Sequence, residues 1–111
     1  MKIEDFVKTY YLHDSLLENV IFDKASNKVT LYVDFCYWLQ KDYEEGPQET
    51  GRIFIEFSNV SSLNYIPHQI NAGEIIKTSY VGNEVTLTVF NDIMNDCFDI
   101  VIKSDCVEVF R

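Results

Sequence analysis

The chain is poor in the residues that build catalytic loops, metal sites and disulfide frameworks. It contains four glycines, two prolines, two histidines and three cysteines among 111 residues. The glycines form no phosphate-binding loop. The cysteines are odd in number and include no C-x-x-C pair, so we expect reduced thiols in the interior and no zinc site. No catalytic residue, metal ion or cofactor is predicted.

Basic residues are also scarce. Nine Lys and Arg residues stand against 18 Asp and Glu, which gives a net charge of −9. The stretch from Thr78 to Ile102 contains no basic residue. Nucleic acid and anionic membranes require clustered cations, so neither is an expected partner. A negative field accelerates the encounter with a basic protein, although it also serves solubility alone.

The first residues contain no apolar segment typical of a signal peptide, and no uncharged run is long enough to cross a bilayer. These features predict a cytoplasmic protein. The length of 111 residues and the hydrophobic content of 47% predict a single globular domain over residues 1–111.

One amphipathic helix is predicted near the N-terminus. Apolar side chains recur there at helical spacing and form one stripe: Ile3, Phe6, Val7, Tyr10 and Tyr11. We expect the helix to end near His13–Asp14–Ser15, where residues that favour turns follow.

The rest of the chain shows the alternation of β-strands. Ser104–Asp105 leaves open whether the last two segments are separate strands or one strand with a bulge. Gly82–Asn83 predicts a type II′ hairpin turn. Gln40–Gly51 predicts an exposed loop, and Pro67 to Gly73 an irregular link that contains His68. The strand-like segments are Leu16–Lys24, Lys28–Leu39, Gly51–Asn64, Glu74–Val81, Glu84–Phe90, Cys97–Lys103 and Cys106–Phe110.

Short connections between strands imply antiparallel neighbours, because parallel pairs need crossovers of a dozen or more residues. The predicted fold class is therefore α+β, with one N-terminal helix packed on a mainly antiparallel, curved sheet of about six strands in a meander. Such a sheet can leave its other face in solvent.

His13 and Asp14 are the pair most suggestive of chemistry. An imidazole held by a carboxylate can act as a base or bind a metal ion. At the end of a helix the same residues have a structural explanation, since the helix terminus favours His13 and a turn favours Asp14. Adjacent residues are also expected to point apart. We favour the structural interpretation and keep a functional role as the alternative.

A nucleophilic cysteine paired with His13 or His68 is a weaker hypothesis. A reactive thiol needs positive surroundings, whereas Cys36 and Cys97 have acidic neighbours in the sequence. We therefore expect both to be small buried hydrophobic residues.

The three aspartates between Asn91 and Ile100 raise the question of a calcium site. Asp92, Asp96 and Asp99 lack the alternating ligands, the central Gly and the terminal Glu of a calcium-binding loop. A polar hairpin loop is the expected structure there.

A binding face is the remaining feature. Tyr32, Asp34 and Trp38 alternate along one side of the longest predicted strand, and Phe54 and Glu56 occupy the matching side of the next. If these strands pair as a hairpin, aromatic and acidic side chains interleave on one surface, where aromatic rings supply anchoring area. The alternative is a second core layer under the helix.

The segment Tyr10–Val20, with His13–Asp14–Ser15 at its centre, resembles the start of small bacterial domains that carry an aromatic residue, then His-Asp-Ser or His-Asp-Ala, then an apolar strand. The run Asn59–Leu63 resembles a later polar segment of the same domains. Some of these families are immunity proteins of polymorphic-toxin systems. The resemblance implies a non-enzymatic inhibitor that docks on a toxin, often a basic nuclease.

Three functions therefore stay open. The first is a small acidic protein-binding module, in particular an immunity-type toxin inhibitor, whose carboxylates pair with Lys and Arg of a basic partner. The second is a small enzyme that uses His13 and Asp14. The third is a structural homodimer in which the final strand pairs edge to edge. The predicted partner-binding residues of the first are Tyr32, Asp34, Trp38, Glu56, Glu84, Asp92, Asp96 and Asp99.

Overall fold

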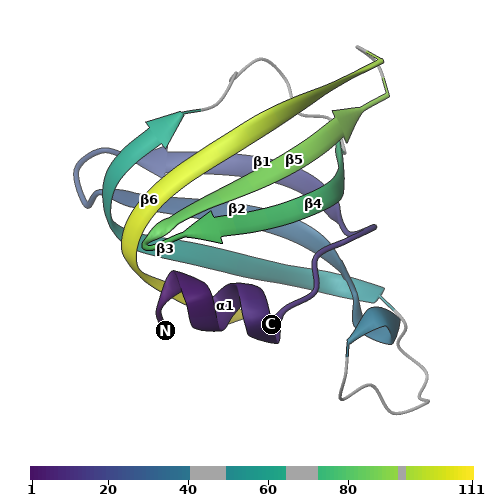
Figure 1. Ribbon diagram of the computed structural model, residues 1–111, viewed down its shortest axis with the longest axis horizontal. Helices are drawn as coiled ribbons and strands as arrows, with labels where there is room; N and C mark the ends of the chain where they lie inside the picture. Colours follow the sequence, from purple (N-terminus) through teal and green to yellow (C-terminus); the bar gives the residue numbers. More distant parts are fainter. Residues whose placement is uncertain (41–49, 65–72, 93–94) are drawn as a thin grey trace.

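The computed structural model describes residues 1–40, 50–64, 73–92 and 95–111. The predicted α+β class, with one N-terminal helix on a six-stranded antiparallel sheet, is confirmed (Figure 1). The link around His68 and most of the predicted loop after Gln40 lie outside the described residues. The elements are α1 (Ile3–Thr9), β1 (Leu16–Asp23), β2 (Lys28–Cys36), a 3-10 helix η1 (Tyr37–Leu39), β3 (Thr50–Asn64), β4 (Gly73–Val81), β5 (Glu84–Asn91) and β6 (Asp96–Phe110).

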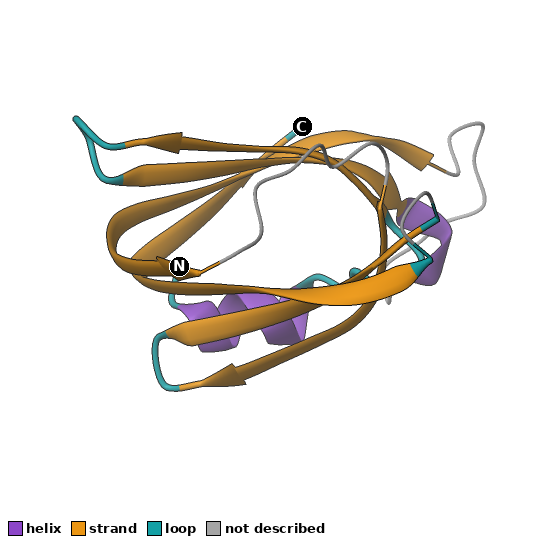
Figure 2. Cartoon of the chain, turned by 90° about the horizontal axis from the view of Figure 1, so that it is seen from above, coloured by secondary structure: helices purple, strands orange, loops and turns teal. Residues whose placement is uncertain are grey.

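The sheet closes on itself, as the view in Figure 2 shows. The strand order is β1-β2-β3-β6-β5-β4, and β1 meets β4 through the pairs Leu16–Glu74 and Leu17–Gly73. This order consists of two three-stranded meanders joined by β3 and β6, which corrects the single predicted meander. β3 and β6 have 15 residues each and pair along most of that length.

The interior is one apolar cluster to which all six strands contribute. Inward and outward side chains alternate along a strand, so the period of two predicted from the sequence defines the buried set. The fully buried strand residues include Leu17, Val29, Leu31, Val33, Ile55, Phe57, Ile75, Val85, Leu87, Val89, Ile100, Ile102 and Val107.

Helix α1 covers the inner side of the sheet and packs against β4 and β6 (Figure 1). The Phe6 ring lies edge-on to the inward Phe57, with ring centroids 5.9 Å apart. The amine of Met1 donates to the Val107 carbonyl at 2.8 Å, and the Val107 N–H donates to the Met1 carbonyl at 2.8 Å. Tyr32 and Phe54 belong to the outward set of β2 and β3, so they are not a second core layer under this helix.

The helix is shorter than predicted. It ends at Thr9, because Tyr10 already has the extended backbone angles φ −110° and ψ 114°. His13 and Asp14 consequently lie in the connection to β1 rather than at a helix terminus. Tyr11, which the predicted stripe would bury, has 53% of its surface exposed.

Strand β2 is also shorter than predicted. Its alternation breaks at Cys36, where Phe35 and Cys36 are both buried. The chain then turns into η1, which contains Trp38. Trp38 therefore does not continue the outward face of Tyr32 and Asp34, as the sequence predicted.

Strand β6 is continuous through Ser104–Asp105, which settles the question left open by the sequence. The irregularity lies on β3, whose register shifts between Val60 and Ser62 and whose Asn59 has a φ of 51°. The buried Ser104 hydroxyl donates to the Ser58 carbonyl at 2.5 Å and holds the two long strands together at this point.

Glycine is required at the seam between β1 and β4. Gly73 pairs with Leu17 across the seam, and a Cβ atom placed on Gly73 would overlap the Cγ1 atom of Val89. Val89 is fully buried in the core. A side chain at position 73 would therefore displace the core at the contact that closes the sheet.

We predict that Gly73→Ala lowers the free energy of unfolding by about 1–3 kcal/mol, because Val89 must shift within a close-packed interior. Chemical denaturation monitored by circular dichroism measures the change. Ser79→Ala, at an exposed position of the same strand, is the control and should change stability by less than about 0.5 kcal/mol. Equal stabilities of Gly73→Ala and the wild type would contradict the steric argument.

Candidate functional site

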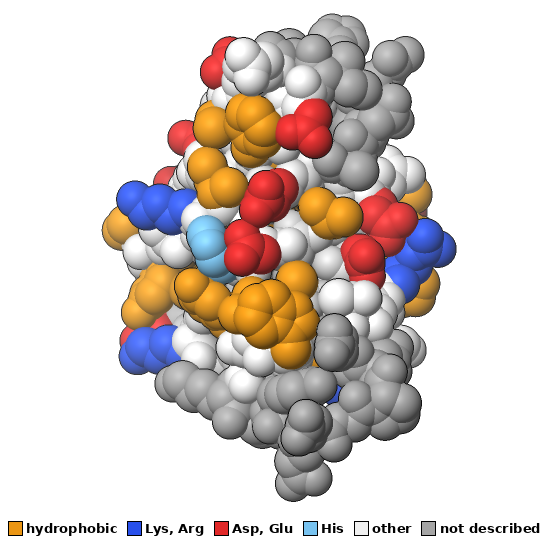
Figure 3. All heavy atoms as spheres, turned by 90° about the vertical axis from the view of Figure 1, so that its right-hand side faces the viewer, with side chains coloured by type: hydrophobic (Ala, Val, Ile, Leu, Met, Phe, Trp, Pro, Cys, Tyr) orange, Lys and Arg blue, Asp and Glu red, His pale blue; other side chains and the backbone are white. Residues whose placement is uncertain are grey.

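Several predicted site residues gather on one side of the molecule, where β1, β3, β4 and β6 begin and β2 and β5 end (Figure 1). Leu16 pairs with Asp34 of β2 on one side and with Glu74 of β4 on the other. Acidic side chains, one histidine and exposed apolar groups lie together in this view (Figure 3). We call this surface the acidic–aromatic face and define it by Tyr11, His13, Asp14, Asp34, Trp38, Glu74 and Asp92.

His13 is held by the backbone of β4. Its Nδ1 atom lies 2.9 Å from the Ile76 carbonyl oxygen, which can only accept, so Nδ1 carries a hydrogen and donates. Its Nε2 atom lies 3.3 Å from Oδ1 of Asp14. The side chains of His13 and Asp14 are 42% and 41% exposed. The helix-terminus explanation for His13 is therefore wrong, since a carbonyl of a neighbouring strand positions the ring.

Asp14 has left-handed backbone angles, with a φ of 66°. This conformation is uncommon for most residues but accessible to aspartate. It turns the carboxylate toward the preceding imidazole, which corrects the expectation that adjacent side chains point apart. The Asp14 N–H donates to the Ile75 carbonyl at 2.9 Å and ties this turn to β4.

Asp14 and Glu74 form a pair of like charges. The protonated form of Glu74 donates a hydrogen bond to Asp14, and this raises the pKa of Glu74; burial, the charge of Asp14 and the charge of Asp92 act in the same direction, while His13 partly opposes them. No Lys or Arg of the described residues forms an ion pair with either carboxylate. This face therefore carries negative charge that no Lys or Arg of the described residues neutralises.

Cys36 lies beneath this pair and is not activated. Burial raises the pKa of its thiol, the charges of Asp14 and Asp34 raise it further, and a hydrogen bond with Ser15 lowers it. The thiol stays protonated at neutral pH, so the expectation of a small buried residue is confirmed for Cys36. It is wrong for Cys97, which is exposed because it belongs to the outward set at the start of β6.

Two exposed aromatic side chains belong to the same face. Tyr11 is 53% exposed and Trp38 is 48% exposed. Gln40 fixes their relative positions, because its Nε2 donates to the carbonyls of Tyr11 at 2.8 Å and Cys36 at 2.9 Å. Its Oε1 accepts from the Tyr11 N–H at 2.9 Å. The 3-10 helix that carries Trp38 is thus fastened to the segment that carries Tyr11.

Tyr32 and Glu56 lie outside this face, on the outward side of β2 and β3. The Tyr32 ring meets Phe54 edge-on, with centroids 5.0 Å apart. Oε1 of Glu56 forms an ion pair with Nζ of Lys28 at 3.2 Å. Both side chains are half-buried, and the Glu56 charge is already compensated.

The remaining predicted carboxylates are dispersed. Glu84 lies in the β4–β5 hairpin and pairs with Lys103 in the strand register. Asp99 accepts a hydrogen bond from the Thr88 hydroxyl at 2.7 Å on the outer side of β5 and β6. Asp96 begins β6 on the same side of the molecule as the acidic–aromatic face. The β4–β5 hairpin forms as predicted, with a φ of 60° at Gly82 in its turn.

Three residues of this site were not predicted. Tyr11 was assigned to the helix stripe, and neither Glu74 nor Gln40 carried a local signal in the sequence. Their roles depend on contacts between segments that are distant along the chain.

This arrangement is suited to holding a cationic group. Carboxylates close to one another bind a guanidinium or ammonium group favourably, and aromatic rings beside them add cation–π and apolar contact. Within the described ranges, no group of three or more His, Cys, Asp or Glu side chains is arranged to hold a metal ion.

No protein-family model, curated protein or solved structure matches this chain. None of the helices in the described part of the chain is long and apolar enough to cross a membrane.

We predict that Glu74→Gln stabilises the fold at neutral pH. The raised pKa of Glu74 means that the folded state binds more protons than the unfolded state, so stability falls as pH rises above the ordinary carboxyl pKa. Removing the charge should raise the melting temperature by about 2–4 °C at about pH 7, equivalent to about 0.5 kcal/mol. The gain should largely vanish at about pH 4, where Glu74 is protonated in the wild type. Thermal unfolding of the wild type and the variant at both pH values measures the difference in melting temperature. An identical gain at both pH values would refute the raised pKa of Glu74.

Proposed function

We propose that this protein is a binding module that holds a cationic segment of a partner protein on its acidic–aromatic face. The observation that carries the proposal is the Asp14–Glu74 carboxylate pair, which is not neutralised by Lys or Arg of the described residues. The exposed side chains of Tyr11 and Trp38 belong to the same face.

A bound cation would improve the electrostatics of this face. An arginine or lysine of the partner, placed between Asp14 and Glu74, would replace their mutual repulsion by two charge-assisted hydrogen bonds. Exposed Trp38 would supply the apolar anchor that protein interfaces commonly concentrate in a few aromatic residues. The net charge of −9 would attract a basic partner before contact.

The resemblance of Tyr10–Val20 to immunity-type domains adds a class of partner to the proposal. The partner would be a basic toxin, and inhibition would occur by occlusion of its functional surface rather than by chemistry on it. Edge-to-edge pairing of the final strand is less favoured, because β6 pairs with β3 from Val107 to Phe110 and Val107 also bonds to Met1 on its other side.

We predict that removing the two charges abolishes capture of the partner. Immobilised wild type should retain basic proteins from the cell of origin at low salt, and Asp14→Asn/Glu74→Gln should retain at least about tenfold less, on the scale of lost interfacial charge pairs. Asparagine also tolerates the left-handed backbone at position 14.

The matched control is Asp105→Asn/Glu108→Gln, which changes the net charge equally at exposed positions that do not belong to the face. It should retain the same proteins as the wild type. Retention of those proteins by Asp14→Asn/Glu74→Gln, or retention of acidic proteins only, would overturn the proposal.

With the captured partner, we predict that the association rate falls by at least about tenfold between about 50 mM and about 500 mM salt, because screening weakens electrostatic steering. Trp38→Ala should instead accelerate dissociation by about tenfold or more. Because Trp38 is 48% exposed, this variant should keep its stability. Surface-binding kinetics measure both rates, and an association rate that is independent of salt would exclude steering.

A further inference from the structure

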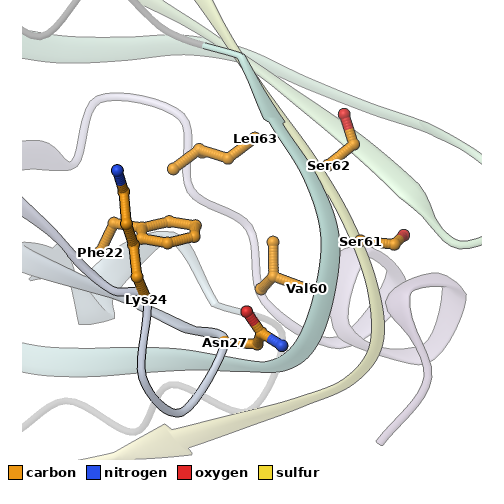
Figure 4. A pocket seen from close by; sticks show the side chains of 7 residues that line it. All are labelled: Phe22, Lys24, Asn27, Val60, Ser61, Ser62 and Leu63. Carbon is orange, nitrogen blue, oxygen red and sulfur yellow. The ribbon is translucent and has the colours of Figure 1, made fainter.

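We propose that a cavity at the β1–β2 turn binds a small amphiphilic anion, namely an apolar chain with a carboxylate head. The cavity lies away from the acidic–aromatic face and has a volume of about 600 Å³, within the range of small-molecule sites. Its lining comprises Phe22, Lys24, Asn27, Val60, Ser61, Ser62 and Leu63 (Figure 4).

The cavity arises from the bend of β3. Strands β2 and β3 stay paired only as far as Val29–Phe57, whereas β3 continues beside β6 to Asn64. The left-handed Asn59 and the register shift at Val60 turn the end of β3 away from β2. The Val60 N–H donates to the Asn27 carbonyl at 3.0 Å and fixes the β1–β2 turn against this bend. The space is therefore built into the fold.

Apolar side chains form the inner wall of the cavity. Phe22 and Leu63 both pack against the core and are only half-buried. They point toward one another across the space, above Val60, while the hydroxyls of Ser61 and Ser62 point away (Figure 4). A chain of several methylene groups between Phe22 and Leu63 would complete their burial, and each methylene removed from water favours binding.

Lys24 determines the charge of the ligand. Its side chain extends beside Phe22 at the cavity (Figure 4), and it forms no ion pair within the described ranges. Most of the surface of this protein repels anions, so an unpaired ammonium next to an apolar wall is a local exception. The Lys24 ammonium group would therefore favour a ligand with a carboxylate head group over one with a neutral head group of the same size.

Titration with octanoate and with 1-octanol, followed by two-dimensional amide NMR of the labelled protein, tests the proposal. Octanoate should produce saturable shifts at Phe22, Asn27 and Leu63. Lys24→Gln should weaken octanoate binding by about three- to fivefold, the scale of one partly exposed ion pair, and change octanol binding by less than about twofold. Leu63→Asn should weaken both ligands.

Lys77→Gln is the matched control, since Lys77 is exposed and does not line the cavity. It makes the same change in net charge and should leave octanoate binding unaltered. The amide spectra also report whether each variant is folded. Absence of saturable shifts at the lining residues, or equal weakening of octanoate by Lys24→Gln and Lys77→Gln, would overturn the proposal without affecting the proposed role of the acidic–aromatic face.

Discussion

The short seam between β1 and β4 is the contact on which both the fold and the site depend. Two register pairs, Leu16–Glu74 and Leu17–Gly73, close the sheet, and the backbone bonds from Asp14 to Ile75 and from Ile75 to Ser15, each 2.9 Å, extend the contact. The same bonds bring Glu74 to Asp14 and the Ile76 carbonyl to His13. Closure of the sheet and assembly of the charged face are therefore one structural event.

The seam also explains why like charges persist at this position. Repulsion between exposed carboxylates is small compared with the burial of a core that includes Leu17, Ile75 and Val89. The fold can therefore hold Asp14 and Glu74 together without a neutralising Lys or Arg among the residues that the structure describes. A cation of a partner that binds between Asp14 and Glu74 would relieve their repulsion, and this relief would add to the free energy of binding.

The two candidate sites have opposite electrostatic character, and the fold keeps them apart. The acidic–aromatic face uses the beginning of β1, and the cavity uses its end at Phe22 and Lys24. The bend of β3 at Asn59 and Val60 creates the second site without altering the first. A protein partner and a small anion would thus occupy different surfaces and need not compete.

The sequence by itself determined the α+β class, the inward sets on β2 and β3, the turn at Gly82 and the excess of negative charge. These features follow from composition and from periodicity over a few residues, which local backbone geometry dictates. Only the tertiary structure decided that β3 lies beside β6, that β2 stops at Cys36, and that His13 meets Ile76, 63 positions away along the chain. Such contacts depend on which strands become neighbours when the whole sheet closes and on how its core fills. The pattern within a single segment does not specify those neighbours.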